Sequence, residues 1–163
     1  MKNRLLALTL TVAMLATTGI AGQTKPASLQ GAWRATEITV TGPNARTLTN
    51  LQPNLTVVSA RHYARVEVQS EGPRPVVADV SKATADELRA VWGPFVAEAG
   101  TYELTGDTLT LHPIASKNPA AMVAGAVIVY SCKLEGNTLT LTQQRNQNGP
   151  YPNPVTFKLT RVE

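Results

Sequence analysis

The chain has 163 residues and a mass of 17.4 kDa, which is the size of a single domain. Its net charge is only +4 and it contains no basic cluster, which argues against nucleic acid as a partner, while 43% hydrophobic residues exclude a disordered polyampholyte. One cysteine excludes an intrachain disulfide framework, and one cysteine with two histidines excludes the usual structural zinc spacings. We therefore expect no metal and no cofactor.

The first residues have the pattern of a secretory signal peptide. Lys2 and Arg4 precede an apolar run from Leu5 to Ala21, which is followed by small residues. An uncleaved membrane anchor is the alternative, but the run is at or below the ~17–25 residues that a spanning helix needs, and no basic flank follows it. We predict an exported protein, periplasmic or secreted, without stable membrane insertion, divided into a signal peptide (1–22), a short linker (23–29) and a domain (30–163).

From residue 30 onward the chain alternates between apolar and polar residues, as β-strands do. This alternation places Glu37 on the same face as Trp33, where it would need a partner such as an arginine. The weakly patterned stretch 42–54 fits either a loop or a ragged strand, and a Pro-rich loop covers 146–154. The strands predicted outside the central part of the chain are Trp33–Val40, Leu55–Ser59, His62–Val68 and Val155–Val162.

Two nearly superimposable segments, Thr101–Leu111 and Ser131–Leu141, give the clearest strand signal. Each contains a Gly-Asp or Gly-Asn dipeptide, which favours the positive-φ geometry of a tight hairpin turn. Apolar residues then share one face of each hairpin, as in an antiparallel sheet that packs on one side only. The predicted facing pairs are Tyr102 with Leu111, Leu104 with Leu109, Cys132 with Leu141 and Leu134 with Leu139.

One helix interrupts the strands. Thr84 and Glu87 have the spacing of a capping box, an apolar stripe at 88, 91 and 92 follows, and Gly93-Pro94 ends the helix. With about eight strands, the chain is all-β, either a sandwich or an antiparallel up-and-down barrel with one short helix, and we favour the barrel. Such a barrel is either filled by side chains or holds one small ligand. We expect the helix to lie against one opening as a partial lid.

Several short stretches resemble a known family. Gly31-Ala-Trp33 resembles the Gly-x-Trp motif of lipocalins, and Arg161 sits where their closing arginine packs over the tryptophan. The whole of 30–163 resembles bacterial lipocalin-like domain proteins. This resemblance implies a ligand-holding barrel, and for the bacterial group it implies no established reaction. The segments that carry it are Arg61–Arg65 through Arg74-Pro75, Trp92–Phe95, Ala99–Glu103, Gly106–Thr108 and Lys117–Asn118-Pro119.

The alternation suggests which side chains line such a barrel. His62 shares a face with Ala64, Val66 and Val68, so we expect it inside, as a ligand contact or a satisfied core histidine, with Tyr63, Arg65 and Glu67 outside. We expect Cys132 to be a buried, unreactive thiol. Trp33 and Arg161 are the expected floor, held by a cation–π contact. Rim candidates are Arg74, Lys117, Asn118 and Trp92. Candidate ligand-binding wall residues are His62, Val66, Tyr102, Leu104, Leu109, Leu111, Ile128, Tyr130, Leu134, Leu139 and Leu141.

Three functions are compatible with these residues. The first is non-enzymatic binding of a small, mostly hydrophobic molecule in the barrel. The second is a filled barrel with a structural or protein-interaction role. The third is an isomerase-, cyclase- or hydratase-type enzyme acting on a hydrophobic substrate, which requires at least two polar groups converging inside the barrel. No nucleophile elbow, phosphate loop or Cys-His motif is present, so we assign no catalytic residue.

Overall fold

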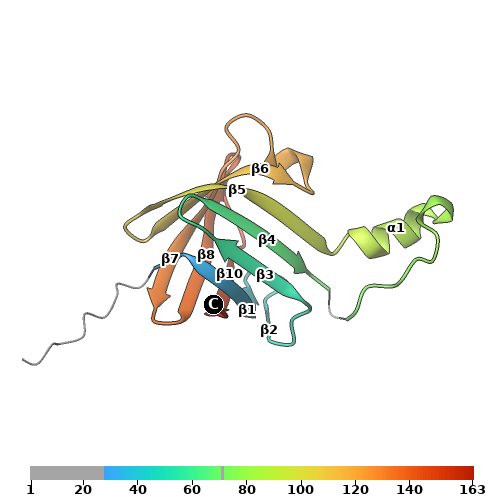
Figure 1. Cartoon of the computed structure of the whole chain (residues 1–163), viewed down its shortest axis with the longest axis horizontal. Coiled ribbons are helices and arrows are strands. Elements are labelled where there is room, and N and C mark those ends of the chain that lie inside the picture. The colour runs from blue at the N-terminus through green and yellow to red at the C-terminus, as the bar shows by residue number, and fades with distance from the viewer. Residues whose placement is uncertain (1–27, 71) are drawn as a thin grey trace, which may run out of the picture.

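A computed structural model describes residues 28–70 and 72–163 (Figure 1). The predicted signal peptide and most of the predicted linker lie outside these residues. Strands dominate the described part, with one α-helix, α1 (Ala85–Trp92), and two short 3-10 helices, η1 (Val80–Lys82) and η2 (Pro119–Ala121). The strands are β1 (Gly31–Val40), β2 (Arg46–Leu48), β3 (Asn54–Val58), β4 (His62–Val68), β5 (Phe95–Thr105), β6 (Thr108–Ser116), β7 (Ile128–Glu135), β8 (Thr138–Asn146), β9 (Gly149–Pro150) and β10 (Val155–Arg161).

Eight of these strands close into an antiparallel barrel. The pairing runs from β10 through β1, β3, β4, β5, β6 and β7 to β8, and β8 pairs with β10 to complete the circle. The short strands β2 and β9 are additions that pair with β1 and β8. The prediction of an all-β, eight-stranded barrel with one short helix is therefore confirmed, and a sandwich is excluded. Closure leaves no unpaired sheet edge around the barrel.

The two repeated segments form the predicted hairpins, β5–β6 and β7–β8. Gly106 and Gly136 adopt φ values of 60° and 58° at the turns, a region that glycine enters without steric cost. The register agrees with the prediction at all four facing pairs: Tyr102 with Leu111, Leu104 with Leu109, Cys132 with Leu141 and Leu134 with Leu139. Turn chemistry and hydrophobic alternation were sufficient to fix these pairings.

A β-bulge in β1 corrects the predicted position of Glu37. The register shifts between Ala35 and Glu37, so that Thr36 is an extra residue on this strand. Beyond the bulge Ile38 packs against the core, which turns Glu37 to the outer face, opposite Lys158 of β10. The prediction that Glu37 shares the face of Trp33 is wrong, and Glu37 needs no arginine inside the barrel.

The barrel is filled at the end where β1 begins. Trp33, Tyr130 and Leu139 are the largest fully buried side chains, with 0–1% of their surface exposed. They come from β1, β7 and β8, and Phe157 of β10 packs on Tyr130 edge to face with 6.4 Å between the ring centroids. Cys132 is buried in the same cluster, and burial raises the pKa of its thiol. This half of the interior is therefore a packed apolar core.

Trp33 and Arg161 form the floor that the sequence predicts. The guanidinium carbon of Arg161 lies 4.1 Å from the centroid of the Trp33 ring, in cation–π geometry. The same guanidinium donates to the carbonyl oxygens of Gln30, at 2.5 Å, and Ser28. The Trp33 indole N–H donates to the carbonyl oxygen of Leu29 at 2.8 Å. Together these contacts fasten the chain that precedes β1 across the closed end of the barrel.

Helix α1 begins at the predicted capping box. The Thr84 side chain accepts from the Glu87 backbone N–H, and the Glu87 carboxylate accepts from the Thr84 N–H. The helix projects away from the barrel beside the start of β5, and none of its residues is buried (Figure 1). The prediction that it lies against an opening as a lid is therefore wrong. Among the described residues, no helix has the length and apolar character needed to cross a membrane.

Candidate binding site inside the barrel

Two adjoining cavities occupy the barrel. The inner cavity has a volume of about 50 Å³, which leaves room for a little water, and lies within the packed core. The outer cavity has about 340 Å³ and lies at the end of the barrel away from Trp33. Ligand pockets range over ~300–1,000 Å³, so of these two cavities the outer one is large enough for a small organic molecule and the inner one is not. Four residues line both cavities: Ala35, Asn54, Glu67 and Phe157.

The outer cavity has a mixed lining. Its apolar side chains come from β1, from β2 and the loop that follows it, from the end of β4 and from β10, and they are Ala35, Ile38, Val40, Leu48, Leu51, Val68, Val155 and Phe157. Its polar side chains come mainly from the segment 50–54 and from the end of β4, and they are Arg46, Asn50, Gln52, Asn54, Glu67, Gln69, Ser70 and Gln143. A molecule with an apolar body and one or two polar groups matches this lining.

Strand β4 faces the opposite way from the prediction. Tyr63 and Glu67 are buried inside the barrel with 4% and 6% exposure, whereas Val66 is 47% exposed and His62 lies on the outer surface. The prediction placed His62 and Val66 inside because they have apolar neighbours. It is wrong because Glu98 of β5 faces Arg65 across the register and gives the inward polar residues a charged partner. Leu55 and Val57 of β3 are also exposed on the outer face, whereas Val58 of the same strand is buried in the core.

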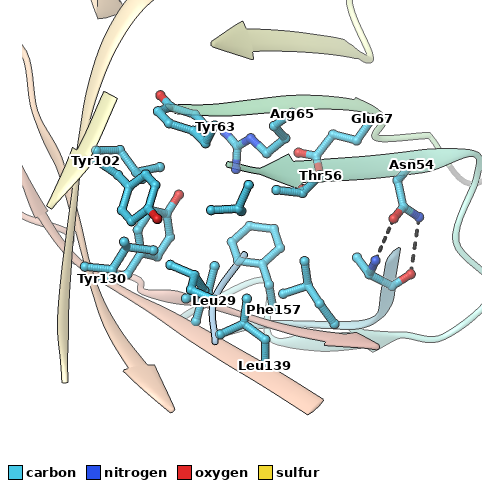
Figure 2. Close-up of a pocket in the computed structure, with 16 residues that line it drawn as sticks. Leu29, Asn54, Thr56, Tyr63, Arg65, Glu67, Tyr102, Tyr130, Leu139 and Phe157 are labelled. Carbon is cyan, nitrogen blue, oxygen red and sulfur yellow. Dashed lines mark hydrogen bonds between the residues drawn. The ribbon is translucent and has the colours of Figure 1, made fainter. Parts of the chain in front are cut away.

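Tyr63 and Arg65 of β4, Glu98 of β5 and Tyr130 of β7 form what we call the Arg65 cluster. Figure 2 shows Tyr63, Arg65 and Tyr130 of this cluster. The Tyr63 hydroxyl donates to Glu98 Oε1 at 3.1 Å, and Arg65 Nη2 lies 3.5 Å from the same oxygen. Burial and the Glu98 carboxylate raise the pKa of Tyr63 well above its ordinary value. Although burial opposes its charge, Tyr130 and the carboxylates of Glu67 and Glu98 raise the pKa of Arg65, which therefore remains a cation.

Glu67 lies between the Arg65 cluster and the outer cavity. It accepts a hydrogen bond from the Gln69 side-chain amide at 2.5 Å, and it lines both cavities. Figure 2 shows its carboxyl group directed toward Arg65. Within 28–70 and 72–163, no ion pair joins Glu67 to a lysine, arginine or histidine. Glu67 is therefore a buried carboxylate at the base of a cavity and has only a neutral hydrogen-bond donor.

Asn54 of β3 fixes the wall beside Glu67, its register partner on β4. Its Oδ1 accepts from the Ala35 N–H at 2.6 Å, and its Nδ2 donates to the Ala35 carbonyl oxygen at 3.2 Å and to the Gln52 carbonyl oxygen at 3.0 Å. The two bonds to Ala35 are the dashed lines in Figure 2. Since these bonds occupy the amide, Asn54 holds β3 to the bulged part of β1 and shapes the cavity rather than offering a free polar group.

The structure brings only part of the predicted wall together. Six of the predicted wall residues line the inner cavity: Tyr102, Leu109, Leu111, Tyr130, Leu139 and Leu141. Ile128 and Leu134 pack against the core without lining it, and Leu104 is 45% exposed near the tip of its hairpin. None of the predicted wall residues lines the outer cavity. The residues that do line it were not predicted from the sequence, although Ile38, Val40, Val155 and Phe157 belong to predicted strands.

The predicted rim residues lie elsewhere, and three of them hold the base of α1. Lys117 Nζ donates to the carbonyl oxygens of Phe95, at 2.8 Å, and of Gly93 and Trp92. The Arg74 guanidinium lies 4.8 Å from the Phe95 ring centroid, and Trp92 meets the same ring edge to face. The fourth, Asn118, caps the start of η2. None of these four residues lines the inner or the outer cavity.

The comparisons with known proteins assign neither a family nor an activity to the chain. The closed eight-stranded antiparallel barrel is the part of the expected resemblance that the structure shows. No protein-family model matches the chain, and no curated protein matches it. Among solved structures, an uncharacterized protein from Bacteroides eggerthii is similar with a TM-score of 0.46 and 8% sequence identity, over 83% of this chain and 100% of that one. Within the described residues, no group of three or more His, Cys, Asp and Glu residues is arranged to hold a metal.

Proposed function

We propose that the protein is an exported, lipocalin-like barrel that binds one small, largely hydrophobic ligand in the outer cavity without transforming it. The observation that carries the proposal is the cavity of about 340 Å³ at the end of the barrel away from the Trp33 floor. Eight apolar side chains supply most of the contact that such a ligand needs. The filled-barrel alternative describes the inner half of the interior, whereas the outer half retains space.

The expected affinity is modest. A ligand that buries ~300 Å² of apolar surface gains roughly 7 kcal/mol at ~25 cal/mol per Å² before the costs of association are subtracted. Hydrogen bonds to the polar lining offset part of those costs. Micromolar dissociation constants, or weaker ones, are therefore expected for simple apolar probes.

Acid–base catalysis is the second candidate, and one observation favours it. Five polar side chains converge inside the barrel, where that function requires two: Tyr63, Arg65, Glu67, Glu98 and Tyr130. Tyr63 and Arg65 each contact the carboxylate of Glu98, so these three side chains are already occupied by one another. Glu67 is the carboxylate that borders the larger cavity. We place this candidate second because it needs Glu67 to move a proton while it is held by the Gln69 amide.

Native mass spectrometry of the full chain, expressed in a secreting bacterial host and recovered from the exported fraction, tests the proposal. A stoichiometric small molecule that is extracted unchanged supports binding. A bound molecule that the protein isomerises or dehydrates supports the second candidate. An apo mass, together with no uptake of the neutral fluorescent probe Nile red, would contradict both and leave the filled barrel.

A pair of variants locates the site. Val155→Trp fills the outer cavity, while Val57→Trp adds the same side chain on the outer face of β3, where Val57 is 44% exposed. We expect Val155→Trp to weaken Nile red binding at least about tenfold and Val57→Trp to leave it within about twofold, because only the first removes cavity volume. Equal effects of the two variants would place the binding site elsewhere.

A further inference from the structure

The charges inside the barrel do not balance. Arg65 is the cation there, and the carboxylates of Glu67 and Glu98 are both buried, with 6% and 7% exposure. The carboxylate of Glu98 has two partners, because it accepts a hydrogen bond from the Tyr63 hydroxyl and lies 3.5 Å from Arg65 Nη2. The described interior therefore holds one positive and two negative side chains, and the surplus negative charge lies on the side of the outer cavity.

Glu67 carries that surplus. Its hydrogen-bond donor is the neutral amide of Gln69, and no cation within the described ranges forms an ion pair with it. The charge of Glu67 acts on Arg65 at least as strongly as that of Glu98 does, but one guanidinium serves both carboxylates and forms its ion pair with Glu98. Burying a carboxylate without a cation of its own costs free energy, so this position favours an incoming positive charge.

The geometry of the outer cavity indicates where the positive charge of a ligand would lie. Glu67 is at its inner end, and Phe157 borders both cavities beside it, while Ile38 and Val155 form the apolar walls. A cationic group at Glu67 with an apolar body extending outward matches this arrangement. An anionic group would instead bring a third negative charge next to Glu67 and Glu98 in a partly desolvated place, where repulsion is poorly screened.

Arg46 is the other charged residue of the outer cavity, and it does not neutralise Glu67. It is exposed on β2, where its guanidinium donates to the Asn44 carbonyl oxygen at 3.4 Å. Because its charge lies in water, salt and solvent screen its effect on the buried carboxylate. A cation that enters the cavity meets only weak repulsion from Arg46.

We propose that the ligand of the outer cavity is a small amine whose protonated nitrogen pairs with Glu67 while its apolar body packs against Ile38, Val155 and Phe157. This inference rests on the proposed function, because it names the class of molecule that the cavity binds. A primary amine is protonated at pH 7, as the lysine side chain is. The nitrogen then supplies Glu67 with the charged donor that the described chain lacks.

Three probes with one apolar body test the charge: 2-phenylethylamine, 2-phenylethanol and phenylacetate, titrated into the full chain at pH 7 by calorimetry. We expect the amine to bind at least about tenfold more tightly than the alcohol, and phenylacetate to bind most weakly. Glu67→Gln should reduce amine affinity to that of the alcohol and leave alcohol affinity within about twofold. The matched control is Glu103→Gln, since the Glu103 side chain is 76% exposed on β5 and should not affect any of the three.

The outcomes separate this inference from the proposed function. If Nile red binds and the amine and alcohol compete equally, or if phenylacetate binds best, the cavity is real and the amine assignment is wrong. If amine preference survives Glu67→Gln while Nile red binding is unchanged, another group selects the charge and the role of Glu67 is refuted. If neither Nile red nor any of the three probes binds, both proposals fail. Nile red binding also shows whether Glu67→Gln has kept the cavity.

Discussion

Replacing Arg161 with methionine should destabilise the barrel by opening its closed end. Methionine keeps an unbranched apolar chain but removes the guanidinium that lies 4.1 Å from the Trp33 ring centroid. It also removes the donor to the carbonyl oxygens of Gln30 and Ser28. The change therefore removes three contacts that join β10 to β1 and to the chain before it, while the apolar core beneath Trp33 stays the same.

The magnitude follows from those contacts. The cation–π contact contributes ~0.5–2 kcal/mol, the upper end applying because the Trp33 ring is fully buried. Hydrogen bonds from a charged donor contribute about 1.5–3 kcal/mol each, but Arg161 is partly exposed, so water replaces some of this loss. We expect the free energy of unfolding to fall by about 3 kcal/mol. For a domain of this size, that lowers Tm by about 10 °C.

Urea unfolding followed by tryptophan fluorescence measures the effect. Trp92 is 49% exposed and would add a second signal, so the series is made in a Trp92→Phe background, where Trp33 is the reporter. Lys158→Met is the matched control, because Lys158 lies on the outer face of the same strand and its loss should change stability by less than ~0.5 kcal/mol. If Arg161→Met costs no more than Lys158→Met, Arg161 does not hold the floor and the reasoning is refuted.

Two further predictions concern the wall of the barrel. Gly100→Ala should lower the free energy of unfolding by about 2–3 kcal/mol, because a Cβ there would overlap the His112 carbonyl oxygen and lie 2.9 Å from Pro113 Cα. A Cβ at Gly72 would meet no atom within 4 Å, so Gly72→Ala should leave that free energy unchanged in the same urea assay. Since the pKa of Tyr63 is raised in the folded state, its phenol stays protonated at a pH where the unfolded chain ionises. The free energy of unfolding should therefore fall above pH ~10, by up to ~1.4 kcal/mol per pH unit for this group, and fall less steeply in Tyr63→Phe. Urea titrations from pH 9 to 11 that give equal slopes for the two proteins would contradict this.

Local signals predicted the β5–β6 and β7–β8 hairpins correctly. Each contains a turn that needs a glycine at positive φ, flanked by alternating residues whose apolar face is unambiguous. The capping box at Thr84 was equally local, and the structure contains it. The Trp33–Arg161 contact, between the two ends of the domain, was predicted from the resemblance to lipocalins. These features depend on neighbours in sequence or on a known motif, and so could be found without the fold.

The orientation of β4 could not be predicted in the same way. On this strand the face that carries Val66 is the more apolar one and points to solvent, whereas the face that carries Arg65 is polar and points to the interior. Hydrophobic periodicity alone therefore gives the wrong face. The compensating residue, Glu98, is 33 positions away and becomes a partner only when β4 pairs with β5. A run of Tyr, Arg and Glu at alternate positions was the signal available, and it needed the pairing to be interpreted.

The outer cavity was missed for a related reason. Its β1 wall, Ile38 and Val40, depends on the bulge at Thr36, which reverses the alternation after Trp33. No glycine or proline in the strand marks that bulge, and Asn54, which bonds to the backbone beside it, comes from another strand. The sequence therefore predicted a barrel and its floor, but it placed the cavity walls at the filled end.

The ends of the described fold both lie beside the Trp33 floor. The Ala32 N–H donates to the Glu163 carbonyl oxygen at 3.3 Å, and Arg161 reaches the backbone of Ser28. Val40 lies seven residues along β1 from Trp33, and Val155 lies six residues along β10 from Arg161. At ~3.3 Å per residue, this end is therefore about 20–23 Å along the strands from the outer cavity. A tether or fusion joined to either end would therefore leave the cavity pointing away from the attachment, so immobilised protein can be screened for ligands with its opening toward the solution.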